Sequence, residues 1–238
     1  MNLFIDTETV PSQQPDALAR AATALKPPGT LKKAESIAAW WANEAGAAAQ
    51  EAWRKQSLDG GSKGEIISIA CTNGEGREWV HCRAQGESEA ALLIAFIEAV
   101  EAWTLEDAGK VTGSASAWPL DDHRLIAHNA QFDLGFLWRR MVVNGVRIPK
   151  WLPGPQARVG KDYGCTMNAW AGYGQRISLN ALCDALVMPS PKQSGMDGSK
   201  VFDAWLAGEH EAIARYNAAD ARAVAAIWWR LQAVGARV

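Results

Sequence analysis

The first strand is predicted by the segment Leu3-Phe4-Ile5-Asp6-Thr7-Glu8, in which a short apolar run is followed directly by acidic residues. A short apolar run of this kind indicates a strand that is buried in the core. Side chains two apart on a strand point to the same face of a sheet. Asp6 and Glu8 are therefore expected to project together from the end of this strand, although such a pair alone is more often a solvated turn than a site.

The rest of the chain predicts an α/β domain with a mixed central sheet flanked by helices. β-branched and alternating residues predict further strands at 65–71, 77–82 and 124–127, with an Asn73-Gly74 turn joining the first two as a hairpin. Apolar periodicity predicts helices at 34–56, 88–103, 130–144, 179–186 and 208–234. We expect one domain over residues 1–238, with a helical insertion at about 11–62.

Two further acids occupy positions that an amphipathic helix would bury. Asp133 shares a helix face with apolar residues three, four and eight positions later, namely Phe136, Leu137 and Met141. Asp220 lies within the apolar stripe of the last helix, which comprises Ile213, Tyr216, Val224, Ile227, Leu231 and Val234. A buried carboxylate is paired, protonated or bound to a metal. Arg215 and Arg222 lie on other faces of the same helix, which disfavours a local ion pair with Asp220.

Three segments thus direct acidic groups toward the interior, where four like charges would repel one another strongly. Divalent cations would relieve that repulsion, and ligation by oxygen alone favours magnesium or manganese over zinc. Two such ions about 3.5–4 Å apart can activate a water and stabilise a leaving oxygen in phosphoryl displacement. Tyr216, one turn before Asp220, could orient that water; the alternative is an ordinary core tyrosine.

The formal net charge of this chain is only −2. A protein that coats nucleic acid through charge alone is strongly basic, so that class of function is excluded. Any contact with nucleic acid should therefore be local. No apolar run approaches the roughly 20 residues that a membrane span needs, and the N-terminus does not resemble a signal peptide. The four cysteines show no metal-site spacing. We expect reduced thiols and a cytoplasmic location.

The acidic segments resemble the three motifs of the DEDD superfamily of 3′-to-5′ exonucleases, which has the ribonuclease H-like fold. The matching segments are Phe4-Ile5-Asp6-Thr7-Glu8-Thr9, His128-Asn129-Ala130-Gln131-Phe132-Asp133 and Tyr216-Asn217-Ala218-Ala219-Asp220. Tyr four residues before the last Asp is typical of the DEDDy subgroup, which includes ribonuclease D and the proofreading domains of family A and B DNA polymerases. The other subgroup has His one residue earlier, where this chain has Arg215.

The resemblance extends over most of the chain. Residues 27–67, 192–201 and 208–220 are similar to stand-alone bacterial and phage exonucleases related to the family B proofreading domain. One departure is Cys165, at a position where relatives often carry Asp.

The resemblance implies a complete reaction. Two Mg²⁺ or Mn²⁺ ions would be held by four carboxylates, namely Asp6, Glu8, Asp133 and Asp220. Water would attack the terminal phosphodiester and release a nucleoside 5′-monophosphate. The residues implied near the substrate are Thr7, His128, Asn129, Phe132 and Lys192. The expected substrate is single-stranded DNA or the 3′ end of a duplex, in a bacterial or phage-encoded enzyme that could serve replication or repair proteins in trans.

Two other functions fit the same residues. One is an RNA exonuclease of the ribonuclease D type, since nothing in the sequence reads a 2′-hydroxyl. The other is a catalytically idle nucleic-acid-binding or scaffold module, whose signature would be loss of one of the four acids. Most of the twelve tryptophans are expected in the core. Trp40, Trp41 and Trp151 lie on more polar segments and are candidates for stacking on bases.

Overall fold

The computed structural model describes residues 1–112, 123–191 and 195–236, and its centre is a five-stranded sheet in the order β3-β2-β1-β4-β5. The strands are β1 (Asn2–Val10), β2 (Glu65–Thr72), β3 (Glu78–Cys82), β4 (Arg124–Ala127) and β5 (Gly164–Cys165). β2 pairs antiparallel with both β1 and β3, whereas β4 pairs parallel with both β1 and β5. This mixed sheet with flanking helices confirms the predicted α/β, ribonuclease H-like class.

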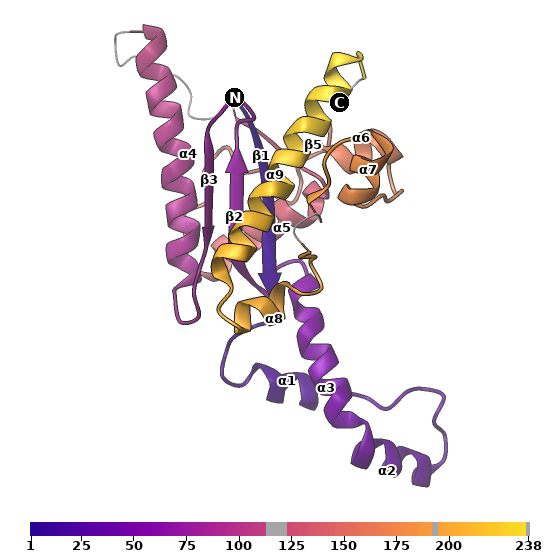
Figure 1. Ribbon diagram of the computed structural model, residues 1–238. Helices are drawn as coiled ribbons and strands as arrows, with labels where there is room; N and C mark the ends of the chain where they lie inside the picture. Colours follow the sequence, from indigo (N-terminus) through magenta and orange to yellow (C-terminus); the bar gives the residue numbers. More distant parts are fainter. Residues whose placement is uncertain (113–122, 192–194, 237–238) are drawn as a thin grey trace.

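Helices cover both faces of the sheet. The longest are α4 (Glu89–Thr112), α5 (Ala130–Val143) and α9 (His210–Ala233), and the shorter ones near the C-terminal half are α6 (Thr166–Ala171), α7 (Leu179–Ala185) and α8 (Val201–Leu206). Figure 1 shows α9 lying across one face of β1 and β2. None of the helices in the described part of the chain has the length and apolar character that a bilayer span requires.

The alternation of β1 divides the core between the two faces. Leu3 and Ile5 pack in one cluster with α4 and α5, whereas Phe4 packs with Val224 and Trp228 of α9. Since side chains alternate along a strand, Asp6 and Glu8 fall on the α9 face and Thr7 on the α5 face. The pairing of β1 with β2 shifts register between Glu8 and Thr9, just after the acidic pair.

An arm formed by α1 (Ala17–Thr23), α2 (Ala34–Asn43) and α3 (Ala45–Arg54) projects beyond the end of the sheet at which β1 ends (Figure 1). A 3₁₀ turn, η1 (Lys55–Leu58), returns the chain from α3 toward the sheet. α1 and α2 both pack against α3. The name arm is used below for residues 17–54.

Several predicted boundaries were wrong. The first strand continues to Val10, so Asp6 and Glu8 lie inside it rather than at its end. The single helix predicted over 34–56 is broken at Glu44 into α2 and α3. Val234, predicted in the buried stripe of the last helix, lies beyond α9 and is exposed.

Candidate active site

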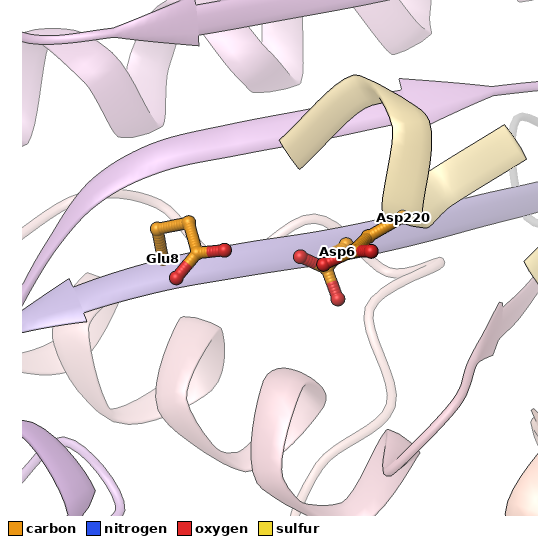
Figure 2. A group of neighbouring side chains, drawn as sticks. All are labelled: Asp6, Glu8 and Asp220. Carbon is orange, nitrogen blue, oxygen red and sulfur yellow. The ribbon is translucent and has the colours of Figure 1, made fainter. Parts of the chain in front are cut away.

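Three of the four predicted acids meet on one face of the sheet. Asp6 and Glu8 project from β1 and Asp220 from the middle of α9, as Figure 2 shows. One carboxylate oxygen from each lies within 4.8 Å of the others. Glu8 and Asp220 are buried, and Asp6 is partly exposed. Residues more than 200 positions apart in the chain thus form one acidic group.

Asp133 adjoins this group from the other face of β1. Its Oδ1 atom accepts hydrogen bonds from the Thr7 backbone N–H at 3.2 Å and from the Thr7 hydroxyl at 2.8 Å. The position of Thr7 near the substrate stays a prediction, and in the structure its backbone N–H and hydroxyl both bind Asp133. The strand residue between Asp6 and Glu8 therefore fixes the fourth acid relative to the other three.

The electrostatics of the four carboxylates are those of a crowded acidic site. The pKa of Asp6 is raised well above its ordinary value, first by burial and then by the charges of Asp220, Asp133 and Glu8. The pKa of Glu8 is raised by burial and by the charges of Asp220 and Asp133. Burial raises the pKa of Asp133 to about 6, although its hydrogen bonds from Thr7 act in the opposite direction. Ionisation of the whole group is costly without a cation.

The arginines considered as partners of Asp220 form ion pairs elsewhere. Arg222 binds Glu78 at 2.7 Å and Arg215 lies 3.5 Å from Glu211, both at the surface. The sequence predicted that Asp220, within the apolar stripe of the last helix, would be buried. The structure confirms this, since Asp220 is buried while both arginines are exposed.

Asn217 is a member of the site that the sequence motifs did not reveal. It is fully buried, and its Nδ2 donates to Asp6 Oδ2 at 2.8 Å. Its Oδ1 accepts from the hydroxyl of Ser68 at 3.3 Å, and Ser68 lies opposite Glu8 in the β1–β2 pairing. Asn217 precedes Asp220 by three residues and so lies on the same side of α9; this spacing was the available signal.

Tyr216 lies beside the acids, as predicted. It is buried, and its pKa is raised, first by burial and then by the charges of Asp220, Glu8 and Asp6 and by a hydrogen bond with Asp220. The phenol is therefore protonated at any ordinary pH and can donate a hydrogen bond.

The remaining predicted substrate residues have different environments. Both ring nitrogens of His128 contact protein groups, with Nε2 2.8 Å from the Ile177 carbonyl and Nδ1 2.9 Å from the Thr166 hydroxyl. Burial also lowers the pKa of His128, which favours the neutral ring. Asn129 is exposed at the start of α5, and Phe132 is half-buried against Phe136. Lys192 lies outside the described residues.

Cys165, at the position where the resemblance implies Asp, caps the N-terminus of α6. Its sulfur accepts from the Asn168 N–H at 3.5 Å and donates to the His128 carbonyl at 3.0 Å. Asp is a preferred N-cap residue because its side chain accepts the same kind of bond. Cys165 thus serves as a helix cap and is not a member of the acidic group.

Comparison with known proteins identifies a family for this chain. Residues 116–238, just over half of the chain, match the family described as "Predicted 3'-5' exonuclease related to the exonuclease domain of PolB". The match includes Asp133, Tyr216 and Asp220, and it begins after Asp6 and Glu8. No match was found among curated proteins. On the family match, the chain belongs to the family of predicted 3′-to-5′ exonucleases related to the exonuclease domain of PolB.

Proposed function

We propose that this exonuclease removes nucleoside 5′-monophosphates from the 3′ ends of single-stranded DNA, using two Mg²⁺ or Mn²⁺ ions held by Asp6, Glu8, Asp133 and Asp220. The observation that carries the proposal is the convergence of Asp6, Glu8 and Asp220 within 4.8 Å on the face of β1 that α9 covers. Asp133, fixed by Thr7, completes the set from α5.

The residues fit such ions in both chemistry and spacing. All donors are carboxylate oxygens, which suit hard divalent cations. Oxygens that share one Mg²⁺ can lie up to about 4.2 Å apart, because each bond is about 2.1 Å. The carboxylate oxygens of Asp6, Glu8 and Asp220 all lie within 4.8 Å of one another, which is compatible with that separation. When bound, the ions would supply an activated water and charge stabilisation of the leaving oxygen.

Tyr216 would position the attacking water by hydrogen bonding. Its phenol lies beside Asp220, and burial and the neighbouring acids raise its pKa, which favours the protonated form that donates a hydrogen bond. A fixed donor near the reacting atoms lowers the entropic cost of reaching the attack geometry.

The 3′-terminal nucleotide would lie against the start of α5. Asn129 is exposed there, and the half-buried ring of Phe132 could contact a base or sugar. His128 would act indirectly in this arrangement, because its ring joins the end of β4 to the loop around Ile177. Replication or repair proteins are candidate partners, and the exonuclease would assist them as a separate chain.

The decisive experiment measures nucleotide release from 3′-labelled single-stranded DNA, duplex DNA and RNA with Mg²⁺ or Mn²⁺, and identifies the product. We expect single-stranded DNA to be the best substrate and a nucleoside 5′-monophosphate to be released. Asp6→Ala and Asp220→Asn should each lower the rate by at least about 100-fold, since even outer partners of metal ligands contribute 10–100-fold. Asp184→Asn, an exposed acid on α7, is the matched control.

Faster release from RNA would replace the proposed substrate with RNA. Full activity of Asp220→Asn would show that the acidic group does not perform the chemistry. An unfolded variant is recognised by comparing its circular dichroism with that of the parent.

A further inference from the structure

The arm is joined to the sheet beside the acidic group. The hydroxyl of Thr9, the residue after Glu8, donates to the Ser57 carbonyl at 2.6 Å. Trp53 donates to the Ser12 carbonyl at 2.9 Å and packs edge-on against Phe202 of α8. These partly buried contacts attach the C-terminal end of α3 and η1 to the strand that carries Glu8.

The loop between α1 and α2 carries a concentration of unpaired positive charge. Residues 24–33 contain Lys26, Lys32 and Lys33 and no acid, in a chain whose net charge is −2. All three lysines are exposed, and within the described ranges none forms an ion pair. The next lysine in the chain differs, since Lys55 of η1 pairs with Glu51 at 2.6 Å.

An exposed indole lies close to these lysines in the sequence. Trp41 of α2 is 46% exposed, while its neighbour Trp40 is 6% exposed and holds it through an edge-on ring contact at 4.9 Å. A half-exposed indole with a fixed orientation is a suitable platform for a nucleic acid base. Trp40 and Trp151, the other two stacking candidates, are buried.

We propose that single-stranded DNA upstream of the 3′ end runs along the arm, with Lys26, Lys32 and Lys33 contacting its phosphates and one base stacked on Trp41. The inference rests on the proposed function and extends it to a second contact region outside the catalytic group. Positive charge together with an exposed aromatic ring is the combination by which proteins bind single strands without reading their sequence.

The test measures binding of fluorescent single-stranded DNA of about 20 nucleotides, long enough to span a typical single-strand binding site, by anisotropy in EDTA at several salt concentrations. Lys32→Ala/Lys33→Ala should reduce the steepness of log K against log salt by about 1.4, since each phosphate contact on a single strand contributes about 0.7. Trp41→Ala should weaken binding by about 5- to 150-fold through lost stacking. Its salt dependence should match that of the parent.

Matched controls are available elsewhere on the surface. Trp170 on α6 is 45% exposed, and Lys161 and Arg230 are exposed bases outside the arm. Trp170→Ala and Lys161→Ala/Arg230→Ala should bind DNA as the parent does. The arm variants should also lose more kcat/KM on the long strand than on a trinucleotide.

Parent-like affinity and salt dependence in the arm variants would overturn the proposal, as would a parent that binds the long strand no better than a trinucleotide. If the parent degrades the trinucleotide and the arm variants bind DNA as the parent does, the proposed role of the arm is refuted and the proposed function stands. A parent that degrades no DNA of either length refutes the proposed function itself.

Discussion

Asn217 links the acidic group to the central strands, because its side chain joins Asp6 on β1 to Ser68 on β2. A donor that holds one oxygen of Asp6 leaves the other directed toward the site. We expect Asn217→Ala to raise the metal concentration needed for half-maximal activity by about 10- to 100-fold, the usual effect of losing an outer partner of a metal ligand. Titration of activity with Mn²⁺ measures this shift.

The metal titration separates positioning from folding. If Asn217 only supports the fold, Asn217→Ala would lower thermal stability while the metal midpoint stayed at the parent value. Ser68→Ala removes a longer and weaker bond at the same point and should cause a smaller shift in the midpoint.

Tyr216 is expected to act on turnover more than on binding. Tyr216→Phe removes only the hydroxyl, so it should lower kcat by about 10- to 100-fold, the loss expected for a hydrogen bond involving a charged group, and leave KM nearly unchanged. Steady-state kinetics on single-stranded DNA distinguish the two constants. Unchanged kinetics would assign the Tyr216 hydroxyl to packing.

The sequence predicted the four acids but not their supporting residues. Asp133 and Asp220 were identified because a carboxylate within an apolar stripe needs an explanation, and both are buried as expected. The role of Asn217 depends on Ser68, a residue 149 positions away on another element. Short local motifs carry no information about such a pair, so only the folded structure reveals it.

At the scale of elements, the loop 59–64 couples the arm to the helix that carries Asp133. The Asp59 carboxylate accepts backbone N–H groups of Gly61, Ser62 and Lys63. Gly61 has φ +90°, and a Cβ there would lie 3.2 Å from the Phe136 ring of α5. Gly61 is therefore required both by backbone conformation and by close packing.

Gly61→Ala should lower the free energy of unfolding by about 1–3 kcal/mol, the cost of one residue held in an unfavourable conformation. It should also lower kcat, because α5 must shift to accommodate the methyl group. Gly46→Ala is the matched control, since a Cβ there meets nothing within 4 Å and Ala favours a helix over Gly by up to about 1 kcal/mol. Urea denaturation measures the free energy of unfolding of both variants. Equal stability would contradict the inference that the contact with Phe136 requires glycine at residue 61.

The elements that the sequence predicted well are those with a long periodic pattern. The predicted last helix, 208–234, corresponds to α9, and the strand predicted at 124–127 corresponds to β4. The short helices α6 and α8 were missed because helices of six residues are stabilised by tertiary packing rather than by local preference. The break between α2 and α3 was missed because the Ala-rich sequence around Glu44 favours helix on both sides.

Across the whole molecule, the buried charges fall into two classes. Glu65 pairs with Arg83, and Glu89 pairs with Arg140, each at 2.6 Å, so these buried acids are satisfied within the protein. At the site, by contrast, burial and the charges of neighbouring acids raise the pKa values of Asp6 and Glu8, and burial raises that of Asp133. The charged carboxylates that the proposed reaction needs therefore destabilise the metal-free fold, and bound cations would offset that cost.

Asp133 gives a test of this opposition in the metal-free protein. Its folded-state pKa of about 6 exceeds the ordinary value of 3.8, so the folded protein holds this proton more tightly than the unfolded chain. Protonation of Asp133 therefore stabilises the fold. That contribution is complete below about pH 4 and is lost as the pH rises through about 6.

Asp133→Asn keeps an oxygen to accept the two hydrogen bonds from Thr7 but carries no charge. In EDTA at about pH 7.5 the variant should unfold about 3–10 °C above the parent, because relief of about 1–3 kcal/mol shifts Tm by a few degrees per kcal/mol at this size. The difference should shrink toward zero near pH 4.

Added Mn²⁺ should then raise the Tm of the parent more than that of the variant, because only the parent retains all four ligands. Differential scanning fluorimetry across pH, with Asp184→Asn as control, measures each shift. A gain in Tm that is the same at both pH values would show that the charge of Asp133 does not limit the stability of the metal-free fold.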